Sequence, residues 1–127
     1  MTERPRLVVA DDNPAFAELI AAGLRTDYDV VVVPDGREAL EECRKGAALL
    51  ISDVGMPEMD AEKLLKELKK DPRTAKLPVV IATATHFHTA SRKRYEADPQ
   101  VKAIFCKPFQ IEELFSRVRS LVTARSA

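Results

Sequence analysis

Five short apolar runs, separated by stretches with helical spacing, constrain the fold of this chain more than any other feature. The runs are continuous and do not alternate with polar residues; they cover Leu7–Ala10, Val30–Val33, Ala48–Ile51, Val79–Ala82 and Ala103–Cys106. Strands that are apolar on both sides are typical of a parallel sheet with helices on both faces.

The stretches between these runs carry apolar residues three and four positions apart, the period of an amphipathic helix. The clearest stripes are at 16–24, 39–43, 64–68 and 111–122, whereas 86–97 has only a thin one. Gly46, directly after Lys45, is predicted to end the second helix. The alternation predicts an α/β fold of five β-α units, with an open five-stranded parallel sheet and helices on both faces.

The composition limits the classes of function. At 127 residues the chain is expected to form a single domain over 1–127. Twenty basic and twenty acidic residues cancel, so no overall field attracts nucleic acid, and no segment has the length and apolarity of a membrane span. Cys43 and Cys106 match neither zinc-site nor redox spacing. We therefore expect a cytoplasmic protein that binds neither nucleic acid directly nor a membrane.

Polar residues stand at the ends of four of the five apolar runs. Asp11 and Asp12 end the first run, Asp53 the third, Thr83 the fourth and Lys107 the fifth. If the strands are parallel, these side chains arrive at one edge of the sheet, where open α/β sheets bind ligands. Three carboxylates in one cleft repel each other unless a cation is present, and hard oxygen ligands suit Mg²⁺. A lysine and a hydroxyl beside them could hold phosphate oxygens.

Each of these residues taken alone also fits an ordinary structural role. Asp11 and Asp12 would serve as a strand-end turn and a helix cap, and Asp53 as a turn residue. The joint arrangement favours a binding site, because turn chemistry gives no reason for four strands to end in parts of one site.

Four segments occur in order along the chain: Asp11-Asp12, DVGMPEMD at 53–60, PVVIATA at 78–84, and KPF at 107–109. Together they resemble the receiver domain of two-component response regulators. The resemblance covers essentially the whole chain, including DGREAL at 35–40. It implies a flavodoxin-like (βα)5 fold with strand order 2-1-3-4-5.

The resemblance also implies a phosphoacceptor site. Asp53 would accept a phosphoryl group from the phosphohistidine of a sensor histidine kinase or a phosphotransfer protein. Asp12 and Asp53 would bind Mg²⁺ directly, Asp11 would hold a water of the metal, and the backbone carbonyl of Gly55 would be the third protein ligand. The domain would later hydrolyse its own acyl phosphate, so the resemblance implies a signalling domain and not an enzyme with other substrates.

The same resemblance implies that Thr83 and Lys107 contact the phosphoryl oxygens and that phosphorylation changes an output surface. That surface would consist of the fourth helix, the fifth strand and the fifth helix, and would meet an output domain, a target protein or a second copy of the chain. Family members usually have Tyr or Phe three residues before the lysine as a switch, but this chain has Ile104 followed by Phe105. The usual switch is therefore absent or rebuilt. The alternative is a receiver-like interaction module with little or no phosphorylation-dependent switching.

Two further positions, Ala61 and Gly55, bear on the comparison with the family. Family members usually carry glycine at position 61; Ala61 stands there, and we expect its turn to form without a positive φ. Gly55 offers no steric screen against water, so we expect no unusually long-lived phosphoryl group.

Two other classes of function fit the sequence less well. Phosphatases and phosphotransferases on a similar sheet usually carry a second aspartate two residues after the nucleophile, where this chain has Gly55. A flavin- or nucleotide-binding module would need a first loop rich in glycine or hydroxyl groups to hold phosphate. The segment ADDNPAF at 10–16 offers carboxylates instead.

Overall fold

The computed structural model describes residues 4–83, 89–106 and 109–126. Strands and helices alternate along the chain, in the order β1 Arg6–Ala10, α1 Pro14–Leu24, β2 Asp29–Val33, α2 Gly36–Arg44, β3 Leu49–Ser52, α3 Ala61–Lys69, β4 Val79–Thr83, α4 Thr89–Ala97, β5 Val101–Cys106 and α5 Ile111–Ser126. In this part of the chain, no helix combines the length and the hydropathy needed to cross a membrane.

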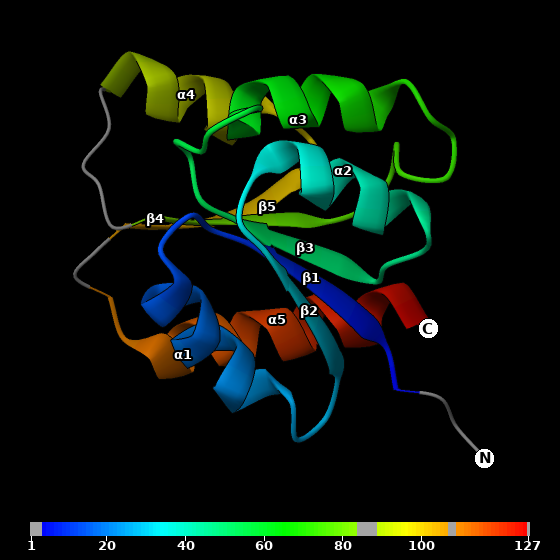
Figure 1. The fold of residues 1–127 in the computed structure, drawn as a ribbon, viewed down its shortest axis with the longest axis vertical. Coiled ribbons are helices and arrows are strands. Elements are labelled where there is room, and N and C mark those ends of the chain that lie inside the picture. The colour runs from blue at the N-terminus through cyan, green and yellow to red at the C-terminus, as the bar shows by residue number, and fades with distance from the viewer. Residues whose placement is uncertain (1–3, 84–88, 107–108, 127) are drawn as a thin grey trace.

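The five strands form one parallel sheet in the order β2-β1-β3-β4-β5, which confirms the fold predicted from the sequence. Helices α1 and α5 cover one face of the sheet, and α2, α3 and α4 cover the other (Figure 1). Successive strand residues therefore serve opposite helical layers, which explains why the strands read as continuous apolar runs.

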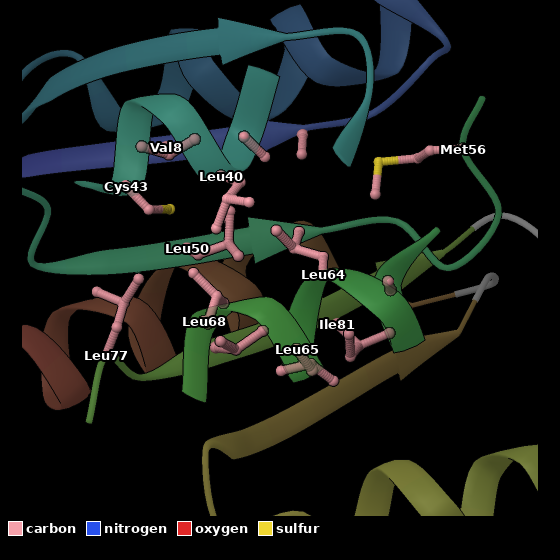
Figure 2. Packing of buried hydrophobic residues seen from close by; sticks show 14 of the residues in the cluster. Val8, Leu40, Cys43, Leu50, Met56, Leu64, Leu65, Leu68, Leu77 and Ile81 are labelled. Carbon is pink, nitrogen blue, oxygen red and sulfur yellow. The ribbon is translucent and has the colours of Figure 1, made fainter. Parts of the chain in front are cut away.

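The larger core lies between the sheet and helices α2, α3 and α4 (Figure 2). Val8, Leu50 and Ile81 point into it from three neighbouring strands, and each is completely buried. They pack against leucines of α2 and α3, including Leu40 and Leu64. We call this layer the α2–α4 core; it holds the sheet on the side that faces the α3 and α4 helices.

The second core lies on the opposite face, between the sheet and helices α1 and α5. Leu7, Leu49 and Val80 point into it from β1, β3 and β4. Ile20 of α1 and Leu114 of α5 complete the layer, and all five side chains are buried. This is the α1–α5 core. Both cores share the same strands, so displacement of one strand affects both layers.

Short polar residues fix where the helices begin and end. Asn13, Asp35 and Asp60 cap α1, α2 and α3, each accepting hydrogen bonds from backbone N–H groups of the first turn. Gly46 has φ +110° just beyond α2, and its N–H donates to the Cys43 carbonyl at 3.1 Å. Left-handed backbone favours glycine, so the predicted end of the second helix is confirmed.

The segment predicted to carry the weakest helix does form one, α4, from Thr89. The first part of the predicted segment, His86–His88, lies outside the described residues. Tyr95 anchors α4, because its side chain is buried in the α2–α4 core with only 5% exposure. Burial raises the pKa of Tyr95 to about 12, and the nearby carboxylates of Asp60 and Glu62 contribute smaller increases.

We expect the fold to lose stability at alkaline pH through Cys43. Burial in the α2–α4 core raises the pKa of this thiol from an ordinary 9.0 to about 12. The folded state holds the proton more tightly, so this contribution is complete below pH 9 and is lost as the pH rises toward 12. Denaturant titrations should show that Cys43→Ala lowers the slope of unfolding free energy against pH in this window by about one proton's contribution.

The matched control is Cys106→Ala, because Cys106 is the chain's other cysteine and is only partly buried. This variant leaves Cys43 in place, so the loss of stability as the pH rises toward 12 should persist. An equal slope in wild type and Cys43→Ala would contradict the role given to the buried thiol.

Candidate functional site

The pairing of β1 with β3 places two aspartates side by side. Ala10 pairs with Ser52 at the ends of the two strands, so the next residues, Asp11 and Asp53, emerge together. The Asp53 N–H donates to the Ala10 carbonyl at 2.9 Å, and the Asp11 N–H donates to the Val33 carbonyl of β2 at 3.1 Å. The backbone of the sheet thus sets where both side chains begin.

Three carboxylates converge at this edge. One carboxylate oxygen from each of Asp11, Asp12 and Asp53 lies within 4.8 Å of the other two. Asp11 is buried, Asp53 is partly buried and Asp12 is exposed, so the cluster runs from the core to solvent. We call these three residues the aspartate cluster.

The cluster stands where the strand order reverses. The chain passes from β1 outward to β2 and then returns to β3 on the other side of β1. Open α/β sheets form binding sites beyond the carboxyl ends of the strands at such a point. Three acidic groups at these distances repel one another, and their hard oxygen atoms are the donors that divalent cations of the Mg²⁺ type prefer. The residues present therefore suit a bound cation.

Local hydrogen bonds hold the carboxylates of Asp11 and Asp53. The Asn13 N–H donates to Asp11 Oδ1 at 2.8 Å, and the Val54 N–H donates to Asp53 Oδ1 at 2.7 Å. Asn13 in turn caps α1, accepting from the N–H groups of Ala15 and Phe16. The carboxylate of Asp11 is thereby tied to the first turn of a helix.

The remaining residues of the predicted site differ in what the structure describes. Thr83 is the last residue of β4 and is completely buried. The register pairs Ser52 with Ile81, so Thr83 lies two residues further along, at the same edge as Asp53. Lys107 lies outside the described residues; it follows Cys106, the end of β5.

The loop after Asp53 has one backbone feature that the sequence did not predict. Glu58 has φ +67°, and around it the Met59 N–H donates to the Pro57 carbonyl at 2.7 Å. Ala61 is the first residue of α3 and is not among the described residues with positive φ, as expected. The left-handed residue of this turn is therefore Glu58, a type of residue that gives little sequence signal for that conformation.

Ile104 and Phe105 lie on opposite faces of the sheet. Ile104 packs on the α2–α4 core, whereas Phe105 packs on the α1–α5 core. The Phe105 ring lies 5.4 Å from that of Phe109, which meets Phe16 of α1 edge-on at 6.3 Å. Phe105 therefore does not replace an aromatic side chain at position 104. Among the described residues, the aromatic side chain buried in the α2–α4 core is that of Tyr95, on a different element.

The family model for the response regulator receiver domain matches residues 7–119, a span from β1 into α5. The chain belongs to this family. A receiver domain is a signalling module of two-component systems and not a classical enzyme. In this chain the aspartate cluster lies inside the matched span, at the edge where β1 and β3 end.

Similar proteins include both kinases and regulators. The sensor histidine kinase TmoS of Ectopseudomonas mendocina is 32% identical over 99% of this chain, which corresponds to 13% of TmoS. The receiver domain of the Francisella response regulator 1452 is 29% identical, with a TM-score of 0.81 and coverage of 95% and 98% of the two chains. The receiver domain of histidine kinase PA1611 from Pseudomonas aeruginosa shares the fold, with a TM-score of 0.82, 21% identity and coverage of 94% and 98% of the two chains.

The chain spans less than two thirds of the length of the first curated relatives that it matches, between 8% and 49% for three of them. These three relatives are a sensor histidine kinase, a hybrid signal transduction histidine kinase and a DNA-binding transcriptional regulator.

Removal of one charge from the aspartate cluster should stabilise the protein when divalent cations are absent. Asp12→Asn keeps the shape of the side chain and removes repulsion from two neighbouring carboxylates, so the free energy of unfolding should rise by on the order of 1 kcal/mol in a chelating buffer. Asp35→Asn is the matched control, since asparagine caps a helix about as well as aspartate and position 35 is outside the cluster. A variant no more stable than wild type would contradict the inferred repulsion.

Proposed function

We propose that the chain is a phosphoacceptor domain in which Asp53 receives a phosphoryl group from a kinase phosphohistidine. The observation that carries this proposal is the convergence of the three aspartate carboxylates within 4.8 Å at the ends of β1 and β3. Membership of the receiver family supports it. We further propose that residues 1–127 act as one domain in the cytoplasm, where kinases draw phosphoryl groups from ATP.

The transfer is a displacement at phosphorus. One carboxylate oxygen of Asp53 attacks the phosphorus, the P–N bond of the phosphohistidine breaks, and its electron pair returns to the imidazole ring. The product is an acyl phosphate on Asp53. In the later hydrolysis, water attacks the phosphorus, the O–P bond breaks, and the electron pair returns to the Asp53 carboxylate as inorganic phosphate leaves.

A divalent cation fits the donors present. Asp12 and Asp53 would bind Mg²⁺ directly, Asp11 would hold one of its waters, and the backbone carbonyl of Gly55 would be the remaining protein ligand. Bound Mg²⁺ would neutralise charge on the approaching phosphoryl group. The related PA1611 receiver domain has a magnesium ion coordinated in its active-site cleft, which supports this assignment.

The chain's own residues would position the phosphoryl group. Asp53 is held at its backbone by β1 and at its side chain by the Val54 N–H, so the nucleophile has a fixed direction. The Thr83 hydroxyl, at the end of the neighbouring strand β4, would donate to a phosphoryl oxygen. Lys107, following β5, would pair with another oxygen. Phosphoryl transfer depends mainly on such positioning and charge neutralisation.

Phosphorylation is expected on Asp53 alone. Incubation of the protein with Mg²⁺ and a small phosphodonor such as acetyl phosphate should add the mass of one phosphoryl group, measured on the intact protein. Asp53→Ala should abolish the gain. The matched control is Asp60→Ala, which removes an aspartate of the same loop that caps α3 and is outside the cluster; it should still be phosphorylated. A gain of equal size in Asp53→Ala would exclude Asp53 as the acceptor.

We also propose that phosphorylation acts on the surface formed by α4, β5 and α5, which would contact an output domain, a target protein or a second copy of the chain. Relatives that join receiver domains to kinases and to regulators are consistent with partners of this kind. The second candidate function is an interaction module without switching. One observation favours it: position 104, on the α4 side of β5, holds Ile104 and so lacks the aromatic ring that serves as the switch in the family.

Amide spectra distinguish these two functions. Beryllium fluoride, a phosphoryl mimic, should shift amide resonances in β5 and α4 if the site is coupled to that surface. The mimic should leave the spectrum of Asp53→Ala unchanged, because the variant lacks the attachment group. Shifts confined to residues 11–13 and 53–60 would instead favour the interaction module.

A further inference from the structure

Gly36, the first residue of α2, is buried against the loop that follows Asp53. A Cβ atom built on Gly36 would lie 2.1 Å from the carbonyl oxygen of Met59 and 2.9 Å from its carbonyl carbon. Real Cβ contacts essentially never fall below 3.0 Å, and both of these obstacles are backbone atoms. A side chain at position 36 would therefore force one of the two backbone segments to move.

Helix α2 is the segment less able to move. Asp35 caps it, accepting from the Glu38 N–H at 2.8 Å through its side chain and from the Ala39 N–H at 3.1 Å through its carbonyl. Ala39 and Leu40, in the first half of the helix, are buried in the α2–α4 core. Displacement of this helix would disturb well-packed side chains, which is costly.

The loop at 53–60 has less support, because Met56 is its one buried residue and most of the others are exposed. The Ala61 N–H donates to the Val54 carbonyl at 3.0 Å and closes the loop at its base. Within it, the turn around Glu58 joins Met59 to Pro57, and the left-handed conformation of Glu58 leaves little freedom for local adjustment. A shift of the Met59 carbonyl is therefore passed along the loop toward Asp53.

We propose that Gly36 is a positioning residue for the aspartate cluster. Its lack of a side chain lets the loop close against α2, and this contact fixes the backbone of Asp53 and Gly55. The functional consequence rests on the proposed function, in which Asp53 and the Gly55 carbonyl are metal ligands. The geometric claim concerns the metal-free protein and is tested independently.

Gly23 supplies a matched control. A Cβ atom at Gly23 would also lie 2.1 Å from its nearest neighbour, the ring of Phe115, but the end of a side chain relieves such a clash more easily than backbone does. That clash lies between α1 and α5, on the opposite face of the sheet, and involves a side chain. An effect of destabilisation alone on Mg²⁺ affinity should appear in Gly23→Ala in proportion to its loss of thermal stability.

The experiment compares Gly36→Ala, Gly23→Ala and wild type as the full chain. Amide spectra without metal should show that Gly36→Ala shifts the resonances of residues 53–60, whereas Gly23→Ala shifts residues of α1 and α5. Calorimetric titration with Mg²⁺ should show affinity about tenfold weaker in Gly36→Ala, the scale seen when groups that orient metal ligands are lost. Gly23→Ala should keep the wild-type affinity even where its thermal stability is lower.

A second variant covers the case in which Gly36→Ala does not fold. The double variant Gly36→Ala/Glu58→Gly places glycine at the turn, where it can adopt other φ values and let the loop move away from the new side chain. The double variant should fold, with shifted amide resonances in the loop and weakened Mg²⁺ binding. Unchanged loop amides in Gly36→Ala, equal loss of affinity in Gly23→Ala, or failure of the double variant to fold would overturn the proposal. No Mg²⁺ binding by wild type would instead overturn the proposed function and leave the amide comparison to decide the geometric claim.

Discussion

Parallel strand pairing, which holds three mutually repelling carboxylates together, is the constraint on which the rest of the structure depends. Parallel pairing of β1 with β3 brings Asp11, Asp12 and Asp53 within 4.8 Å of one another, and no sheet of this register can separate the first residues after the two strands. Two continuous cores hold the strands in place on both faces. The apolar layers thus keep together acidic groups that would move apart in a looser framework.

The same arrangement explains how the site can respond to a ligand. A bound cation would relieve repulsion in the folded state and would have no matching site in the unfolded chain, so its binding would add to stability. Phosphorylation would then change the charge at one member of the cluster, beside the buried Thr83 and the loop at 53–60. That loop is supported by Gly36 on α2, whereas the Glu58 turn restricts how it can rearrange. In the proposed function, a change at Asp53 would therefore act on the neighbouring strands and helices.

Much of the fold follows from the sequence because its causes are local or periodic. Continuous apolar runs predict β1 to β5, and Gly46 predicts the end of α2. The convergence of Asp11 and Asp53 also follows, since parallel strands bring their carboxyl ends to one edge. Features that depend on contacts between distant segments could not be predicted from the sequence. The approach of Gly36 to the Met59 carbonyl is one, and the DGREAL segment signals only a capped helix.

Other features could not be predicted from the sequence for the same reason. Glu58 has a positive φ because the loop must close between Val54 and Ala61, a requirement that its side chain does not reveal. Phe105 follows Ile104 in sequence, but the alternation of a strand sends the two side chains to different cores. The burial of Tyr95 depends on where α4 settles against the sheet.

The most direct test of the central claim is the dependence of thermal unfolding on Mg²⁺ concentration in the wild-type protein. If the clustered carboxylates form a cation site, the unfolding temperature should rise steadily once the ion exceeds its dissociation constant, as expected for a ligand bound only by the folded state. An unfolding temperature that does not respond to Mg²⁺, or that responds equally to matched ionic strength from NaCl, would contradict the account.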